Sequence, residues 1–145
     1  MLSALPTFVD NLFAAWNAHD VTAVLSHYAA DYEELDVARA QPVRGHSEVS
    51  RLMAYYLHAF PDLSIVLDDC LIDGNRMALY WTWQGTQRAT FMNIPPTGLR
   101  VSVRGTSLVV LSEGKIRRAL RIWDLAGLLR DLKLLPELQA KEVHE

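Results

Sequence analysis

Asp124 is the residue whose type and position are best suited to chemistry. It follows Ile122 and Trp123 at the end of an apolar segment and precedes Leu125. A carboxylate at the mouth of an apolar pocket loses hydration, and it can then hold and release a proton near neutral pH. A positioned acid/base of this kind contributes about 10²–10⁴-fold in rate. The structural alternative is that Asp124 caps a helix that begins near Leu125, because aspartate is a preferred N-cap residue.

Aromatic side chains are the second group of candidates. Trp81 and Trp83 alternate onto one face of an expected strand, and Gln87 shares that face. We expect this face to bind a flat, apolar ligand. Further aromatic candidates for substrate binding are Trp16, Tyr32, Tyr56 and Phe60. The alternative for each of these aromatic residues is a place in the hydrophobic core.

Other common catalytic patterns do not occur in the sequence. The five histidines form no HExxH or HxH pattern, so we expect no metal site. His27 and His58 are the two that could face a pocket from helices. Cys70 lies in an apolar segment and is expected to be an inert buried thiol. No glycine-rich phosphate loop or Ser-His-Asp pattern is present, and we expect no cofactor.

The elements that must position these residues follow from the spacing of apolar side chains. Helical spacing predicts helices over residues 7–17 and 47–59, and Asp20 is a candidate N-cap for a short helix between them. Strand patterns cover residues 63–72, 77–86, 101–111 and 116–123, whereas residues 32–37 are a short strand or irregular.

Helices followed by hairpins indicate an α+β fold. We expect a cone-shaped α+β barrel, in which a curved antiparallel sheet wraps around the N-terminal helices and leaves a pocket at its open end. Gly85 and Gly105 lie inside long strands and are candidates for the bends that such curvature needs.

Length and composition favour one globular domain over residues 1–145. Half of the 145 residues are hydrophobic, and the formal net charge is −3 with no block of like charges. A nucleic-acid surface is therefore not expected. No run of 18 apolar residues and no secretory signal is present, and the single cysteine fits a reducing cytoplasm.

The last long strands predict how the chain assembles. Within residues 107–111, apolar side chains occur at both odd and even positions of the expected strand. Both faces of the sheet must therefore be covered. One helical layer covers one face, and a second copy of the chain is the simplest cover for the other. We therefore expect a homodimer.

The order of several motifs resembles that of the SnoaL-like polyketide cyclases, which belong to the nuclear transport factor 2-like superfamily. The relatives of this family include ketosteroid isomerase and limonene epoxide hydrolase. The resemblance covers most of the chain and is weakest before Gly45. It is carried by Phe60-Pro61-Asp62, Trp81-Thr82-Trp83-Gln84-Gly85-Thr86, Ile94-Pro95-Pro96-Thr97-Gly98, Gly114-Lys115-Ile116, Trp123-Asp124 and Gly127-Leu128-Leu129.

The resemblance implies roles for several residues. Asp124 matches the proposed proton shuttle of the family in intramolecular aldol ring closure, a reaction that needs no cofactor. Tyr32 and Asp36 match polar groups at the mouth of the pocket, although Asp36 is alternatively a solvated loop acid. The chain has Gln87 where family members often carry a histidine, and residues 101–111 contain none. A partner for Asp124 is therefore not visible in the sequence.

Three function classes follow. The first is a cofactor-free lyase or isomerase that acts on an apolar, enolisable substrate. The second is a non-catalytic protein that binds a small hydrophobic molecule. The third is an epoxide-type hydrolase, for which two acids and an arginine would have to converge on water. The residue types for such a site are present in Asp36, Asp124, Arg104, Arg118 and Arg121.

Overall fold

The computed structural model of this chain describes residues 5–136. Its helices are α1 (Leu5–Asn17), α2 (Val21–Leu25), α3 (Gly45–Ala59) and α4 (Leu125–Asp131). Its strands are β1 (Tyr28–Asp36), β2 (Val43–Arg44), β3 (Ser64–Asp73), β4 (Arg76–Thr86), β5 (Arg100–Ser112) and β6 (Lys115–Trp123). Within the described residues, no helix has both the length and the apolar character needed to cross a membrane.

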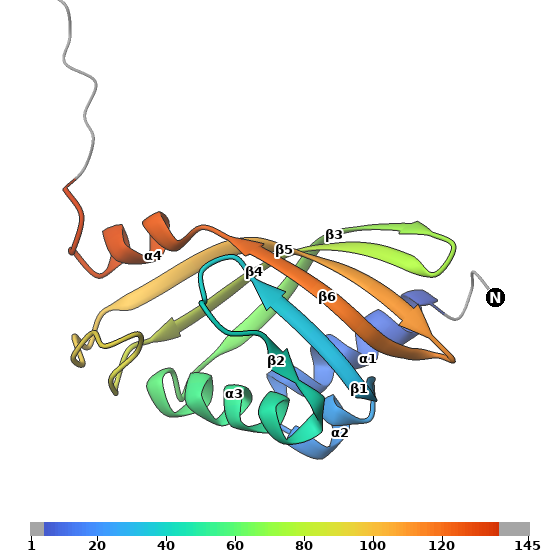
Figure 1. Cartoon of the computed structure of the whole chain (residues 1–145). Coiled ribbons are helices and arrows are strands. Elements are labelled where there is room, and N and C mark those ends of the chain that lie inside the picture. Colours follow the sequence, from blue (N-terminus) through green and yellow to red (C-terminus); the bar gives the residue numbers. More distant parts are fainter. Residues whose placement is uncertain (1–4, 137–145) are drawn as a thin grey trace, which may run out of the picture.

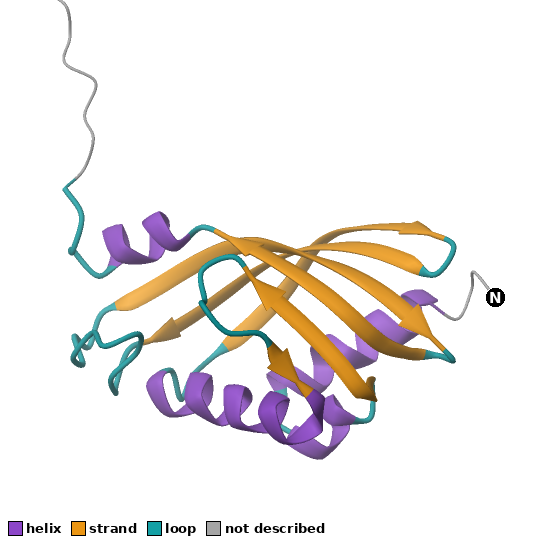
Figure 2. Ribbon diagram, viewed as in Figure 1, coloured by secondary structure: helices purple, strands orange, loops and turns teal. Residues whose placement is uncertain are grey.

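The six strands form one sheet in the order β2-β1-β6-β5-β4-β3. All neighbouring strands are antiparallel except β1 and β6, which are parallel. The sheet curves over α1 and α3, whereas α4 lies at one end of it (Figure 1 and Figure 2). The predicted α+β cone with a curved sheet around the N-terminal helices is confirmed. The sheet is open, with β2 and β3 at its edges.

The first strand is longer than the sequence pattern predicts. It begins at Tyr28 and pairs with β6, with Leu35 opposite Leu120 and Asp36 opposite Arg121. Acidic residues within the segment hide its strand character, because they are depleted in strands. The pairing places the second half of β1 beside the end of β6, and this juxtaposition builds the site described below.

The core lies between the concave face of the sheet and the helices. Val49, Leu52, Met53 and Tyr56 recur at helical spacing on α3 and are all buried. The predicted cap of α2 is confirmed, since Asp20 Oδ1 accepts a hydrogen bond from the Ala23 backbone N–H at 3.1 Å. On the sheet, Met77, Leu79, Trp81 and Trp83 alternate inward along β4.

The irregularities in strand pairing do not fall at the two glycines that were predicted to bend the sheet. Register shifts interrupt the pairing between Leu67 and Asp69 and between Val110 and Leu111, whereas β4 pairs regularly with β5 through Gly85 and Gly105. Gly105 makes room for two tryptophan side chains. A Cβ atom there would lie 2.5 Å from the Trp81 ring and 2.6 Å from Trp123 Cβ.

Replacing Gly105 with alanine is expected to lower the free energy of unfolding by about 1–3 kcal/mol, because the added methyl overpacks the Trp81–Trp123 contact. Urea denaturation measures the change. The exposed Ser112→Ala on the same strand is the matched control, with an expected change within about 0.5 kcal/mol. Equal stability of the Gly105→Ala and wild-type proteins would show that the indoles move aside without strain.

Candidate active site

An aromatic cavity lies under the curved sheet. Its volume is ≈ 70 Å³. Its walls come from α1, α3 and every strand except the short β2, and they are mainly apolar. Five of the sequence candidates line it, namely Trp16, Tyr32, Tyr56, Trp81 and Trp83. Such a cavity suits a small, flat, apolar ligand.

A buried polar network opens on this cavity. The Tyr32 hydroxyl donates a hydrogen bond to Glu34 Oε1 at 2.8 Å, and Arg121 Nη2 lies 3.1 Å from the same oxygen. The Glu34 side chain is only 2% exposed. Tyr32 and Arg121 line the cavity, whereas Glu34 lies behind them. The network thus connects a buried carboxylate to the cavity through a hydroxyl and a guanidinium.

Burial sets the protonation states of this network. Burial raises the pKa of Tyr32 far above its usual range, and the neighbouring Tyr28 and Glu34 raise it further. For Arg121, burial lowers the pKa, but Glu34 and the nearby tyrosines raise it by more, so the net shift is upward. Tyr32 therefore stays a neutral hydroxyl and Arg121 stays a cation.

Two further tyrosines face the same cavity. Burial raises the pKa of both Tyr28 and Tyr56 to about 12, against a partial lowering by Arg121. The Tyr28 ring packs edge-on against Tyr32 at 4.6 Å between centroids, and Tyr56 packs edge-on against Trp83 at 5.8 Å. Their hydroxyls remain protonated at neutral pH and are hydrogen-bond donors at the cavity wall.

Raising the pH above about 10 is expected to destabilise the fold through Tyr28 and Tyr56. Their folded pKa of about 12 exceeds the ordinary tyrosine pKa of 10.0, so the unfolded chain loses these protons first. At pH values below the tyrosine pKa of the unfolded chain, the free energy of unfolding is unaffected. It falls as the pH rises toward the tyrosine pKa of the folded protein, by up to about 2–3 kcal/mol per tyrosine. Denaturation at about pH 8 and pH 11.5 measures the loss. A loss of the same size in Tyr56→Phe would contradict the assignment.

Asp36 lies at the end of β1 beside this network. Its Oδ1 accepts hydrogen bonds from Trp123 Nε1 and from the Ala38 backbone N–H, each at 2.8 Å. The residue is 6% exposed, so the alternative of a solvated loop acid is wrong. Asp36 does not itself line the cavity. The Trp123 indole, which donates a hydrogen bond to Asp36, lines it.

Three buried polar atoms of these neighbouring residues have no hydrogen-bond partner among the described residues. They are Glu34 Oε2, Asp36 Oδ2 and Arg121 Nε. Glu34 and Asp36 are two residues apart on β1, and Asp36 is opposite Arg121 in the parallel register. Unpaired buried groups are rare, and each one is explained by a catalytic role, by strain or by a bound water or ion. The network is therefore the strongest candidate for chemistry in the described chain.

Comparisons with known proteins assign the family. A profile of the SnoaL-like polyketide cyclases matches residues 7–132. The chain belongs to this family. The predicted resemblance is thus confirmed. No curated protein matches the SnoaL-like chain.

Solved structures agree with the family. AclR from Streptomyces galilaeus, described as a candidate hydroxylase, is 26% identical, with a TM-score of 0.84 over 96% of this chain and 91% of that one. IdmH from Streptomyces antibioticus, described as a candidate polyketide cyclase, is 21% identical, with a TM-score of 0.76 over 88% and 97%. A Catenulispora acidiphila protein with a ketosteroid isomerase-like fold is 17% identical, with a TM-score of 0.77 over 90% and 95%. The last two show the fold alone.

Asp124 of this SnoaL-like protein lies outside the cavity wall. Its Oδ1 accepts a hydrogen bond from the Gly127 backbone N–H at 2.8 Å, and its side chain is 46% exposed. The capping role is confirmed, and Asp124 is not among the residues that line the cavity, whereas the adjacent Trp123 is. The reason is alternation along β6, which turns Trp123 inward and the next residue outward.

Gln87 and Phe60 also lie away from the cavity wall. Gln87 is fully buried and anchors the proline-rich loop, since its Oε1 accepts hydrogen bonds from the Thr97 backbone N–H and hydroxyl at 3.2 and 2.7 Å. Phe60 is fully buried against Trp83 and Phe91, at 4.9 and 5.1 Å between ring centroids. Phe60 therefore supports the wall residue Trp83 from behind, whereas Gln87 holds the loop.

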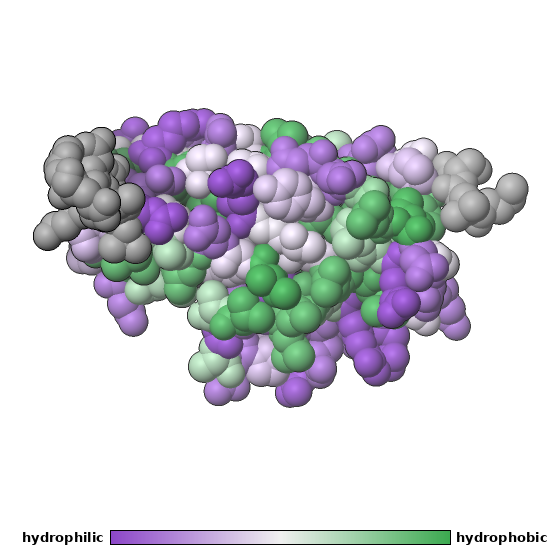
Figure 3. All heavy atoms as spheres, turned by 90° about the horizontal axis from the view of Figure 1, so that it is seen from above, coloured by the Kyte–Doolittle hydropathy of each residue, from purple (hydrophilic) through white to green (hydrophobic). Residues whose placement is uncertain are grey.

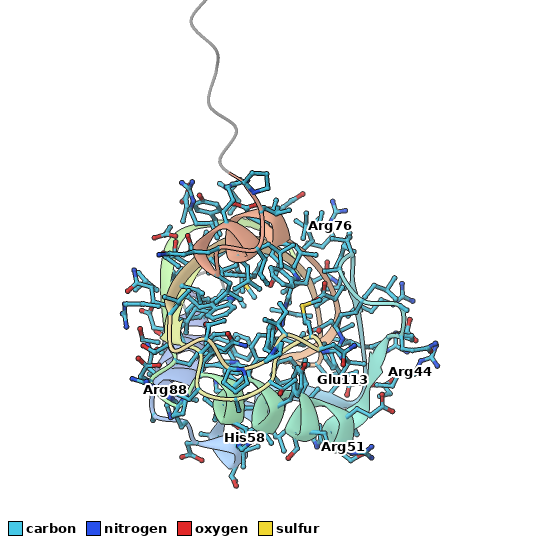
Figure 4. All side chains as sticks on the ribbon, turned by 90° about the vertical axis from the view of Figure 1, so that its left-hand side faces the viewer. Arg44, Arg51, His58, Arg76, Arg88 and Glu113 are labelled. Atoms are coloured by element: carbon cyan, nitrogen blue, oxygen red, sulfur yellow. The ribbon has the colours of Figure 1, made fainter. Side chains whose placement is uncertain are left out.

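The histidine and cysteine candidates do not reach the cavity either. His58 is exposed on α3 and points away from the interior, as Figure 4 shows in a view from the end with the proline-rich loop. His27 Nδ1 is 2.8 Å from the Ala23 carbonyl oxygen. Cys70 is a partly buried free thiol. Over residues 5–136, no three His, Cys, Asp or Glu side chains are grouped so that they could hold a metal ion.

Sequence reasoning missed Glu34, counted Tyr28 among the aromatic residues of the core, and considered Arg121 only for the hydrolase. One signal was available. Tyr28, Tyr32, Glu34 and Asp36 have the same parity, which in a strand places them on one face. Two acids that share a strand face with two tyrosines indicate a site only if that face is known to be buried. The sequence alone does not show that it is.

Proposed function

We propose that this SnoaL-like protein is a cofactor-independent acid/base enzyme that transfers a proton on an apolar, enolisable carbonyl compound, as in intramolecular aldol ring closure. The observation that carries the proposal is the Tyr32–Glu34–Arg121 network at the wall of an aromatic cavity. Membership of the SnoaL-like polyketide cyclase family supports the same class of reaction.

The first step removes a proton from carbon. Glu34 is the proton acceptor, and Tyr32 lies between it and the cavity. The C–H proton moves to the Tyr32 oxygen while the Tyr32 proton moves to Glu34 Oε1, so no free tyrosinate forms. The enolate oxygen accepts hydrogen bonds from the Arg121 guanidinium and the Tyr56 hydroxyl, both at the cavity wall. Donors aimed at developing negative charge in a dry site are the strongest source of such catalysis.

The second step forms the ring. The enolate carbon attacks a second carbonyl of the same molecule, and its electron pair becomes the new C–C bond. The resulting alkoxide takes a proton from Tyr32, which regains one from Glu34. One proton leaves and one returns, so the reaction needs no redox partner. The aromatic walls hold the two ends of the substrate in contact.

The experiment is deuterium exchange into 2-tetralone, an enolisable bicyclic ketone. The wild-type protein in D₂O should accelerate the loss of the C1 proton signal over buffer alone. Binding of 2-tetralone without acceleration would instead favour the non-catalytic alternative, in which the cavity only holds a small hydrophobic molecule.

An epoxide-type hydrolase is the second candidate. It is favoured by the unpaired Glu34 Oε2, Asp36 Oδ2 and Arg121 Nε, since two acceptors and one donor suit a bound water. Arg121 is the one arginine of the three predicted candidates that is partly buried, whereas Arg104 and Arg118 are exposed. Formation of the diol from cyclohexene oxide, absent in Asp36→Asn, would support this function over proton transfer.

We also propose that the protein is a homodimer formed through the outer face of the sheet. Large apolar side chains are exposed there, including Leu35, Leu71 and Leu108 at 52%, 69% and 43%. Figure 3, which looks onto this face, shows apolar groups gathered among polar ones. A hollow of ≈ 530 Å³ on this face is lined by these leucines and also contains two acids and two arginines, Glu33, Asp73, Arg76 and Arg118. A two-fold partner can pair the opposite charges with its own.

Light scattering at micromolar concentration is expected to give twice the mass of the chain. The double variant Leu71→Glu/Leu108→Glu should halve that mass, because it places charges in the apolar contact. Arg51→Glu, on the outer side of α3 away from the sheet (Figure 4), is the control and should remain dimeric. A monomeric wild-type protein would contradict the proposed assembly.

A cytoplasmic location also stays a prediction.

A further inference from the structure

A serine hydroxyl lies on the sheet side of the cavity and has no part in the network described above. Ser107, on β5, lines the cavity, and its Oγ accepts a hydrogen bond from Trp81 Nε1 at 2.9 Å. Among residues 5–136, this is the one hydrogen bond of that oxygen. The hydroxyl hydrogen is therefore free to donate. A free donor on a mainly apolar wall is suited to fix the oxygen of a ligand.

The strand register explains how the Trp81 indole reaches this serine. Trp81 is paired with Gly105, and Ser107 is the next inward position along β5. Such diagonal neighbours are about 7–8 Å apart, which is within the reach of a large aromatic side chain. A Cβ atom on Gly105 would lie 2.5 Å from Trp81 Cη2, so the indole occupies the space that a larger residue would fill. The bond that it donates orients the Ser107 oxygen and makes its O–H a stronger donor.

The register also places Ser107 beside the cation of the cavity wall. Ser107 is directly opposite Arg121 in the antiparallel pairing of β5 with β6, and both line the cavity. Opposite residues on one face of such a pair have Cβ atoms about 4.5–5.5 Å apart. The guanidinium has five N–H groups, of which Nη2 lies 3.1 Å from Glu34 Oε1. An oxygen of a ligand between the two strands can therefore accept hydrogen bonds from both side chains.

We propose that Ser107 is a further ligand-binding and catalytic residue, which donates a hydrogen bond to the same substrate oxygen as Arg121. Its part in binding needs no reaction. Its part in catalysis rests on the proposed function, because that oxygen becomes the enolate oxygen and Ser107 adds a donor where negative charge develops. Ser107 keeps its own proton throughout. Trp81 acts through Ser107 and is a positioning residue.

The binding experiment compares 2-tetralone with tetralin, which has the same fused rings but no carbonyl oxygen. Tryptophan fluorescence reports binding, because the four tryptophans of the sequence all line the cavity. Ser107→Ala should weaken 2-tetralone binding by about 3–10-fold, the contribution of one hydrogen bond, and leave tetralin binding nearly unchanged. Equal losses for the two ligands, an undiminished affinity for 2-tetralone, or no binding of 2-tetralone to the wild-type protein would overturn the proposal.

Three further variants make the result specific. Ser112→Ala, at the exposed end of β5, should bind both ligands as the wild-type protein does. Should Ser107→Ala fail to fold, Ser107→Cys gives the same comparison, since a thiol is only a weak donor. Trp81→Phe keeps an aromatic ring without the N–H, and it should reduce the preference for 2-tetralone by less than Ser107→Ala does. An unchanged preference in Trp81→Phe would overturn the positioning role.

Deuterium exchange into 2-tetralone separates this inference from the proposed function. Ser107→Ala should lower kcat for exchange by about tenfold or more, beyond any rise in KM. Exchange by the wild-type protein that this variant retains in full would overturn the catalytic role of Ser107 and leave proton transfer standing. A lost preference for 2-tetralone in Ser107→Ala, with no exchange by the wild-type protein, would support the binding role and overturn the enzymatic function.

Discussion

Replacing Glu34 with glutamine is expected to lower the rate of proton transfer by about 10²–10⁴-fold, the contribution of a positioned acid/base. Glutamine keeps the size of the side chain and can still accept a hydrogen bond from Tyr32, but it cannot take up the substrate proton. The measurement is the rate of deuterium exchange into 2-tetralone, with circular dichroism to verify that the variant is folded.

Two control variants make this result specific. Glu33→Gln changes the adjacent acid on the outward side of β1, whose side chain is 45% exposed and pairs with Arg44. Asp124→Asn changes the exposed helix cap. Both should retain near wild-type exchange. If Asp124→Asn loses activity while Glu34→Gln keeps it, the acid/base is Asp124, as the family resemblance first implied, and the proposed network is structural.

Replacing Arg121 with methionine is expected to lower the free energy of unfolding by about 3–5 kcal/mol, because it leaves the buried Glu34 carboxylate without its cation. The Glu34 side chain is 2% exposed, so solvent cannot compensate for the loss. Urea denaturation measures the effect. Arg51→Met, at an exposed position on the outer side of α3, should change the stability by no more than about 0.5 kcal/mol.

A double-mutant cycle separates pairing from packing. Glu34→Gln/Arg121→Met removes both charges, and it should be more stable than Arg121→Met alone because no buried charge is left unpaired. Additive losses in the two single variants would mean that the ion pair contributes nothing beyond the volume of its side chains.

The layout of the fold was accessible from the sequence because local patterns encode it. The helical spacing of Val49, Leu52 and Tyr56 predicted α3, and alternation predicted β4 and β6. The parallel pairing of β1 with β6 could not be predicted, since it joins segments about 85 residues apart and no local rule encodes such a contact. That pairing is what creates the site.

The candidate site was predicted only in part for the same reason. Trp81 and Trp83 were found through strand alternation, which is local. Glu34 was missed because an isolated acid is normally exposed, and its burial depends on Arg121 from another strand. Asp124 fitted both a cap and an acid/base, and the sequence had no means of telling which way it faces.

The most direct test of the central claim compares the wild-type protein with Tyr32→Phe in deuterium exchange at C1 of 2-tetralone. Tyr32 joins the cavity to Glu34, so removing its hydroxyl should break the path of the proton while leaving the aromatic wall in place. We predict that the wild-type protein accelerates the exchange and that Tyr32→Phe loses about 10²-fold or more of this acceleration. Exchange by Tyr32→Phe at the wild-type rate, or no acceleration by the wild-type protein, would contradict the account.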